Sequence, residues 1–391
     1  MIICCNPLLN LPHELLSLIL QFLDISSKFS LNMTYKVLIR QFHVKESLYD
    51  IRIDAILNNH TKLFKWLDLL NDCTDDTKHK LCIVAAKSDN IDILKYLLNN
   101  QTPSSYEQFQ NILLASATGG SLEITKWLDS NRSRYDGSKA IDSYDVCIKA
   151  AENGHLKLLK WLIDNGYLTF SNATISNSTI KNGHFDIVRY LHEKKCHWNE
   201  WSCTIAAENG HLEILKYLHK NGRSWDRYTC MGAAEIGRLD ILKYLHENGC
   251  PWDTHSFFHA IENGHLNILR YLHENGCHWN VYVCSHATTK GHLDILKYLH
   301  ENGCPWNEYS CVCAAEIGRL DILKYLHENG CHWNVYVCSH AVKNGHFDVV
   351  RYLHENGCPW NENECTNAAA RNGHFDILKY LQTGVHETKI S

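Results

Sequence analysis

The sequence predicts an all-α solenoid of paired short helices, preceded by a small helical head. Two observations support this prediction. A glycine-centred segment recurs every 27 residues along much of the chain, and each copy holds two short apolar stretches of helical periodicity, each closed by a glycine. By length alone, 391 residues would fill two or three globular domains. A repeat of this size instead indicates units that bury their apolar faces by stacking on one another.

The repeat is marked by a glycine in an "NGH" or "IGR" turn. The evenly spaced glycines are Gly183, Gly210, Gly237, Gly264, Gly291, Gly318 and Gly345. Gly154 precedes this run, Gly373 follows it, and weaker copies centre on Gly120, Asp89 and Asn59. We therefore expect about twelve units and divide the chain into a head at 1–47, divergent repeats at 48–145, and regular repeats with a short C-terminal tail at 146–391.

One unit, residues 305–330, predicts the local structure of the others. Asn307 precedes an apolar segment and is expected to cap a first helix over 308–316, which Gly318 ends because glycine accepts the left-handed conformation. A second helix is expected over 320–329, again ended by a glycine. The capping position is Asn or Asp in each of these units: Asn199, Asp226, Asp253, Asn280, Asn307, Asn334 and Asn361.

The stretch "AAENGHLEILKYLHKNG", from Ala206 to Gly222, resembles the core of the ankyrin repeat, with its Ala pair, Gly-His turn and Leu-rich second helix. The resemblance implies an ankyrin-type helical solenoid whose concave face binds proteins. The ankyrin unit has about 33 residues, and the residues missing here fall where ankyrins carry a projecting β-turn finger, so we expect reduced fingers. Arrays with such short Trp- and Cys-bearing links resemble ankyrin-type proteins that giant DNA viruses encode in expanded sets, which implies a location in the host cytoplasm.

The head has a different pattern. "LNLPHELLSLILQFLD" places aliphatic residues at helical spacing after a proline. It resembles the opening of an F-box, which implies docking on a Skp-type adaptor of a cullin–RING ubiquitin ligase. The matching residues are Leu11, Pro12, Glu14, Leu15, Leu16, Ile19, Leu20 and Leu23. The following stretch lacks the Trp usual in that family, and a helical cap over the open end of the solenoid explains the same pattern.

Composition excludes several function classes. The formal net charge of −5 gives no reason to expect a polyanionic partner. The apolar N-terminus has no basic start and is too short for a membrane span, so we expect a cytoplasmic protein with reduced cysteines. No phosphate-binding loop, nucleophile elbow or kinase motif occurs. We therefore expect a monomeric, non-enzymatic protein without catalytic residues or cofactors.

Cysteine and histidine recur in the links, which raises the alternative of a metal site. Cys pairs such as Cys304 and Cys311 lie seven residues apart, which is not a typical zinc spacing. The His that follows the first Cys in some links is Pro in others, as at Pro305, so we expect no metal ligands and assign the thiols to packing. The link Trp, as at Trp306, is expected to form a hydrophobic staple with Cys311.

Histidine and basic residues also form ladders. A His that ends each second helix, such as His300, is expected to serve the last carbonyls of that helix. The basic row is Lys216, Lys243, Arg270, Lys297, Lys324, Arg351 and Lys379. An acid lies three residues earlier in most units, so we expect solvated ion pairs rather than a nucleic-acid surface.

One ladder is not explained by stacking. The third residue after each link Trp is aromatic in most units, and the residue before it varies in charge. Both fall in the first turn of the first helix, on the side that faces the concave groove in ankyrins. Exposed aromatic residues beside variable charges are typical of protein interfaces, although packing of the rings on one another is an equal alternative. The predicted partner-binding residues are Trp201, Arg227, Tyr228, His255, Tyr282, Glu308, Tyr309 and Tyr336.

Overall fold

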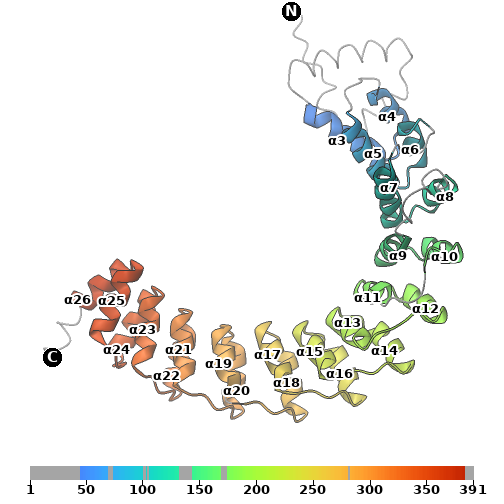
Figure 1. Cartoon of the computed structure of the whole chain (residues 1–391). Helices are drawn as coiled ribbons and strands as arrows, with labels where there is room; N and C mark the ends of the chain where they lie inside the picture. The colour runs from blue at the N-terminus through green and yellow to red at the C-terminus, as the bar shows by residue number, and fades with distance from the viewer. Residues whose placement is uncertain are drawn as a thin grey trace, which may run out of the picture. The chain divides into compact units, whose positions relative to one another are not determined.

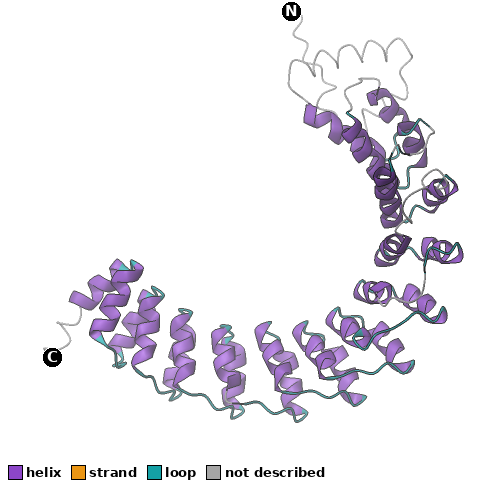
Figure 2. Cartoon of the chain, viewed as in Figure 1, coloured by secondary structure: helices purple, strands orange, loops and turns teal. Residues whose placement is uncertain are grey.

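A computed structural model of the chain describes residues 45–68, 74–99, 103, 105–131, 143–168, 174–280 and 282–383. All regular secondary structure within these residues is helical, and no strand occurs among them (Figure 2). The described helices, α3 to α26, form twelve consecutive pairs (Figure 1). The expected all-α solenoid of paired short helices is therefore confirmed.

The chain divides into two compact units, residues Met1–Trp198 and Asn199–Ser391. Helices of the first unit are α3 (Lys45–Leu57), α4 (Thr61–Asp68), α5 (Asp75–Lys87), α6 (Ile91–Leu97), α7 (Tyr106–Gly119), α8 (Leu122–Ser130), α9 (Ser143–Glu152), α10 (Leu156–Asp164), α11 (Thr174–Lys181) and α12 (Phe185–Glu193). Its described residues include the weaker copies of the repeat.

The second unit contains the most regular copies. Its helices are α13 (Ser202–Glu208), α14 (Leu212–Lys220), α15 (Arg227–Glu235), α16 (Leu239–Glu247), α17 (Thr254–Glu262), α18 (Leu266–Glu274), α19 (Tyr282–Thr289), α20 (Leu293–Glu301), α21 (Glu308–Glu316), α22 (Leu320–Glu328), α23 (Val335–Lys343), α24 (Phe347–Glu355), α25 (Glu362–Asn372) and α26 (Phe375–Thr383). Within this unit the first helices of the pairs lie along one side and the second helices along the other (Figure 1).

The helix ends follow from capping. The Asn307 side chain accepts a hydrogen bond from the backbone N–H of Tyr309 at 3.1 Å and starts α21. At the end of α22, Gly330 adopts φ +79° and the Cys331 N–H donates to the Leu326 carbonyl at 2.9 Å, which is a Schellman motif. This motif places an apolar residue just after the glycine, which accounts for the buried Cys331.

The weaker copies confirm that the backbone conformation, rather than glycine itself, defines the turn. Asn59 and Asp89 take the place of the turn glycine in the first unit, and their φ angles are +56° and +58°. Asn and Asp tolerate this left-handed conformation better than other side chains that carry a Cβ. The sequence comparison therefore identified the correct residues even where the glycine is missing.

Neighbouring helix pairs are linked by hydrogen bonds from the side chain of the residue that follows the turn glycine. Nε2 of His346 donates to the Glu316 carbonyl at 2.9 Å, and the Arg319 guanidinium donates to the Gly291 carbonyl at 2.7 Å. The Glu316 carbonyl lies in the last turn of the preceding first helix, and the Gly291 carbonyl lies just beyond the end of such a helix. Carbonyls at these positions lack an intrahelical partner, and the His and Arg side chains supply one. In these two units, His and Arg therefore each form a hydrogen bond to a carbonyl of the preceding unit, although to carbonyls at different positions.

A second joint combines the His that ends each second helix with the link Trp. The His300 ring stacks on Trp306 at a centroid distance of 3.7 Å, and its Nδ1 lies 3.2 Å from the Tyr325 hydroxyl of the next second helix. The structure thus gives this His an inter-unit partner in place of the carbonyls that we expected it to serve. The Trp packs against the preceding helix end, and its staple with Cys311 stays a prediction.

The expected ion pairs along the basic row are only partly correct. Lys216 contacts Glu213 at 3.0 Å, as predicted. The predicted partner of Lys324, Asp321, instead binds the Arg319 guanidinium through two oxygens at 2.8 and 2.7 Å. Asp240 does the same with Arg238. A planar guanidinium two residues away matches a carboxylate better than an ammonium does.

The lysines whose expected acidic partners bind an arginine instead place their ammonium groups over tyrosine rings of the next unit. Lys243 lies 5.7 Å from the ring centroid of Tyr271, and Lys324 lies 5.4 Å from that of Tyr352. Cation–π contacts of this kind stabilise neighbouring second helices. None of the described helices combines the length and the apolar character that a membrane-spanning helix requires.

Candidate functional site

The predicted binding surface lies in the first turns of the first helices of the second unit. There the capping residue also positions the aromatic side chain two residues later. Asn280 accepts from the Tyr282 N–H at 3.0 Å, and Asn334 accepts from the Tyr336 N–H at 3.0 Å. A capped first turn holds the backbone of this residue at the helix end. One hydrogen bond from the tyrosine N–H to the Asn side chain therefore both caps the helix and fixes the backbone position of the tyrosine.

The start of α13 departs from this arrangement. α13 begins at Ser202 rather than directly after Asn199, and Asn199 accepts a hydrogen bond from the Ser202 hydroxyl at 3.2 Å. Trp201 therefore takes the N-cap position instead of the second position of the helix. Its ring lies 6.0 Å from the ring of Tyr228, so the expectation that neighbouring rings pack on one another is correct for this pair.

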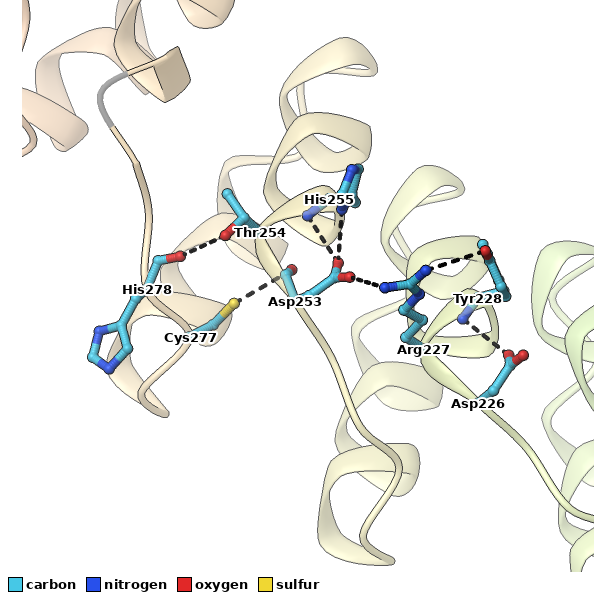
Figure 3. Close-up of polar contacts among 8 residues, drawn as sticks. All are labelled: Asp226, Arg227, Tyr228, Asp253, Thr254, His255, Cys277 and His278. Atoms are coloured by element: carbon cyan, nitrogen blue, oxygen red, sulfur yellow. Dashed lines mark hydrogen bonds and ion pairs between the residues drawn. The ribbon is translucent and has the colours of Figure 1, made fainter.

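Polar contacts join α15 to α17 (Figure 3). Asp253 lies at the centre of this polar cluster, which we define as Arg227, Tyr228, Asp253 and His255. Asp253 accepts from the Arg227 guanidinium at 3.4 Å and from the His255 backbone N–H at 2.9 Å, and His255 Nδ1 lies 3.3 Å from the same carboxylate. The guanidinium also donates to the Tyr228 hydroxyl at 3.3 Å and lies 5.2 Å from the centroid of that ring. Three predicted residues are thus brought together and engaged with one another.

Three predicted tyrosines are arranged differently, and we call them the tyrosine row: Tyr282 in α19, Tyr309 in α21 and Tyr336 in α23. Their exposed fractions are 64%, 57% and 58%, against 40% for Tyr228. Among the described residues no ring–ring contact involves any of the three. The nearby Cys313 raises the pKa of the Tyr309 hydroxyl. The row therefore offers aromatic area to solvent that the rest of the array does not cover.

Few charges accompany the tyrosine row. Glu308, which precedes Tyr309, is exposed and forms no ion pair with described residues. The equivalent residue beside Tyr336 is Val335, whose exposed fraction is 41%. At the other end of α21, Glu316 lies 3.7 Å from Nδ1 of His340 in α23. Among the described first-turn residues of α19, α21 and α23, Glu308 is therefore the one carboxylate, and it lies beside the central tyrosine.

The recurring cysteines lie in the core. Burial raises the pKa of the Cys277 and Cys358 thiols to about 12. The thiols of Cys311 and Cys331 approach each other at 3.2 Å between a first helix and the following link. Among the residues that the structure describes, no group of three or more His, Cys, Asp or Glu side chains is arranged to hold a metal ion. The packing role predicted for Cys304 and Cys311 is confirmed by their burial.

The F-box-like residues from Leu11 to Leu23 lie outside the described residues. Sequence reasoning missed two features of the described array: the polar cluster around Asp253 and the His–Trp–Tyr joint. The periodicity contained a signal for the joint, because His300, Trp306 and Tyr325 each belong to a ladder that recurs every 27 residues. The cluster depends on the coincidence of Arg227 with Asp253, which periodicity does not reveal.

Comparison with known proteins identifies the repeat. The family model described as ankyrin repeats (3 copies) matches residues 147–229, 203–283, 230–310 and 311–389. These matches cover more than half of the chain and include every predicted residue of the binding surface. No curated protein matches the sequence.

Solved structures of helical repeats show a more distant likeness. The pentatricopeptide repeat protein PPR10 from maize shares 12% sequence identity, with a TM-score of 0.35, and the match covers 95% of this chain and 63% of that one. PPR10 in complex with an 18-nt psaJ RNA element shares 11% identity, with a TM-score of 0.31, over 95% of this chain and 67% of that one. The chain thus spans less than two thirds of the length of the first of these structures.

Proposed function

Because the chain belongs to the ankyrin-repeat family, we propose that it is a non-enzymatic interaction protein that binds a partner protein along the first helices of its second unit. The tyrosine row carries this proposal. Exposed tyrosines at equivalent positions in three consecutive units bury large area at small conformational cost, which is why Tyr is enriched in the energetic centres of interfaces. The polar cluster at α15–α17 forms one border of this surface.

Affinity capture with the full chain tests the proposal. The wild type and the variant Tyr282→Ala/Tyr309→Ala/Tyr336→Ala are immobilised separately, and retained proteins are quantified by mass spectrometry. Phe375→Ala is the matched control, because Phe375 is an exposed aromatic residue with an exposed fraction of 71% in a second helix. We expect a partner that the wild type and the control retain and the triple variant loses. Equal retention by all three proteins would contradict the proposed surface.

The head adds a second proposal, which rests on its sequence. We propose that residues 1–47 dock on a Skp-type adaptor, so that the repeats serve as the substrate receptor of a cullin–RING ubiquitin ligase. The pattern from Leu11 to Leu23 supports this proposal. The alternative is an ankyrin scaffold or competitor without a ubiquitin-ligase link, in which the head only caps the solenoid.

Co-purification distinguishes these two alternatives. The adaptor should co-purify with the full chain and should be lost with Leu16→Asp/Leu20→Asp, while the circular dichroism of the array is retained. Absence of adaptor binding by the intact chain would leave the scaffold alternative. If the head is only a cap, deletion of residues 1–45 should destabilise the repeats without removing a partner.

A further inference from the structure

We propose that the tyrosine row binds a proline-rich segment of the partner protein in the polyproline II conformation, with a basic residue of that segment opposite Glu308. This inference rests on the proposed function and specifies the chemistry of the partner. Three observations support it: the spacing of the tyrosines, the hydrogen-bonding capacity of their hydroxyls, and the position of the one carboxylate among them.

The spacing matches a helix with three residues per turn. α19, α21 and α23 pack side by side as consecutive first helices, and packed helices lie about 8–10 Å apart. Because the tyrosines occupy equivalent positions, neighbouring members of the row have about the same separation. A polyproline II helix rises about 9 Å per three-residue turn. A ligand with proline at every third position therefore meets one tyrosine with each turn.

A β-strand fits this spacing less well. Side chains on one face of a strand repeat about every 6.6 Å, which is out of step with the helix separation. A strand ligand also requires an exposed sheet edge to pair with, and the described residues contain no strand. Polyproline II ligands instead dock on aromatic side chains and need no backbone ladder.

The tyrosine hydroxyls favour a ligand with free carbonyl groups. In the described part of the chain, the hydroxyls of Tyr282 and Tyr336 form no hydrogen bond, so both can donate to a ligand. Polyproline II has no internal hydrogen bonds and leaves its backbone carbonyls available. An α-helical ligand has already used its carbonyls along its own axis. The free hydroxyls of Tyr282 and Tyr336, on either side of Tyr309, are therefore better suited to the first kind of ligand.

Glu308 determines the charge of the ligand. It is exposed at the start of α21, beside the central tyrosine, while Val335 occupies the equivalent position in α23. A basic ligand residue near Tyr309 gains a partner, and an acidic one is repelled. The row has definite ends because Tyr228 and His255 are engaged in the polar cluster and because Asn363 takes the equivalent position in α25. The ligand segment that contacts all three rings is thus about six to seven residues long.

Peptide binding to the full chain tests the inference. The probes are fluorescein-labelled pools of about twelve residues with proline fixed at every third position, arginine fixed near the centre and the other positions randomised. In one control pool the fixed prolines are alanine, and in another the arginine is glutamate. Fluorescence anisotropy is measured with the wild type, Tyr309→Ala, Glu308→Lys and the control Phe375→Ala, after circular dichroism has verified each fold.

We expect the proline–arginine pool to bind about tenfold or more tightly than the alanine pool, and Tyr309→Ala to lose about tenfold in affinity. Glu308→Lys should reverse the preference from the arginine pool to the glutamate pool, a change that damage to the fold would not produce. Equal binding of the proline and alanine pools would overturn the inference. The inference would also be overturned if no peptide pool binds while the tyrosine row still captures a partner protein, and in that case the proposed function stands. If neither peptide binding nor tyrosine-dependent partner capture is observed, both the inference and the proposed function are overturned.

Discussion

Replacement of Gly318 by alanine should destabilise the array more than replacement of Gly330, although both glycines belong to the same unit. Their φ angles are +71° and +79°, and this conformation costs a residue with a Cβ about 1–2 kcal/mol. A Cβ on Gly330 would meet nothing within 4 Å, whereas one on Gly318 would lie 2.4 Å from Nδ1 of His346. His346 must then move and release its hydrogen bond to the Glu316 carbonyl.

The loss of that hydrogen bond adds about 0.5–1.5 kcal/mol. We therefore expect Gly318→Ala to lower the free energy of unfolding by about 1.5–3.5 kcal/mol and Gly330→Ala by about 1–2 kcal/mol. Alanine also restricts the unfolded chain at both positions, so this effect largely cancels in the comparison.

The assay must resolve local stability, because repeat arrays can unfold in parts. Urea unfolding followed by circular dichroism gives the global change, and amide hydrogen exchange gives the change at residues 314–346. We expect the exchange protection around His346 to fall in Gly318→Ala and to persist in Gly330→Ala. Equal losses in the two variants, or a larger loss for Gly330→Ala, would show that the contact with His346 contributes nothing to the joint.

Three further predictions concern the joints and the core. Arg319→His should keep the hydrogen bond to the preceding unit, whereas Arg319→Ala should lose about 1–2 kcal/mol in urea unfolding; equal losses would contradict the equivalence of the two turn residues. Burial lowers the pKa of His273, so the unfolded state binds its proton more readily. Neutral His273 therefore contributes to the free energy of unfolding above pH 6.5, and this contribution is lost as the pH falls through the folded pKa. Below pH 6.5, the melting temperature should fall less steeply with pH in His273→Gln than in the wild type. Burial raises the pKa of the Cys277 and Cys358 thiols to about 12, so iodoacetamide at about pH 8 should alkylate them slowly before unfolding and rapidly in urea; rapid native labelling would refute this.

The sequence predicted the fold well because stacking leaves few alternatives. A unit with two short helices cannot bury its apolar faces alone, so the period of 27 residues determines both the pairing and the order of helices. The bounds of α21 agree with the expected 308–316 because Asn307 and Gly318 are strong local signals. Ion pairs were predicted less well: the spacing placed Asp321 beside Lys324, and only the structure shows that Arg319 takes the carboxylate.

The sequence predicted where the residues of the binding surface lie, but not which of their side chains are exposed and which are contacted by neighbouring residues. The caps place an aromatic residue at the same point of successive first helices, which the spacing reveals. Whether the ring is free depends on contacts between units. Tyr228 is engaged by Arg227 and by Trp201, while Tyr282 stays exposed. The pattern that the units share contains no information about such partners, because Arg227 stands at this position in one unit only and Trp201 belongs to the neighbouring unit.

Two nearly identical copies show how small the difference between an engaged and an exposed tyrosine is. The chain has the same residues from Ala233 to Cys250 and from Ala314 to Cys331. The first helix that leads into the first copy begins with Arg227, which contacts Asp253 of the next unit. The first helix that leads into the second copy begins with Glu308, and the next unit has Asn334 at the position equivalent to Asp253. We therefore predict that Glu308→Arg/Asn334→Asp transfers the polar cluster to α21 and α23 and covers Tyr309.

The transferred guanidinium forms an exposed ion pair and lies against the ring of Tyr309, so the contacts together should favour the covered ring about threefold or more. Nitration of Tyr309 by tetranitromethane, followed by mass spectrometry, should slow accordingly, and partner capture should weaken although the tyrosine is unchanged. Asn334→Asp alone is the matched control, since it keeps the cap and lacks the guanidinium. High salt should restore much of the nitration rate by screening the exposed pair. A double variant that is nitrated as fast as the control at low salt would contradict the prediction that an arginine and an aspartate at these positions suffice to cover Tyr309.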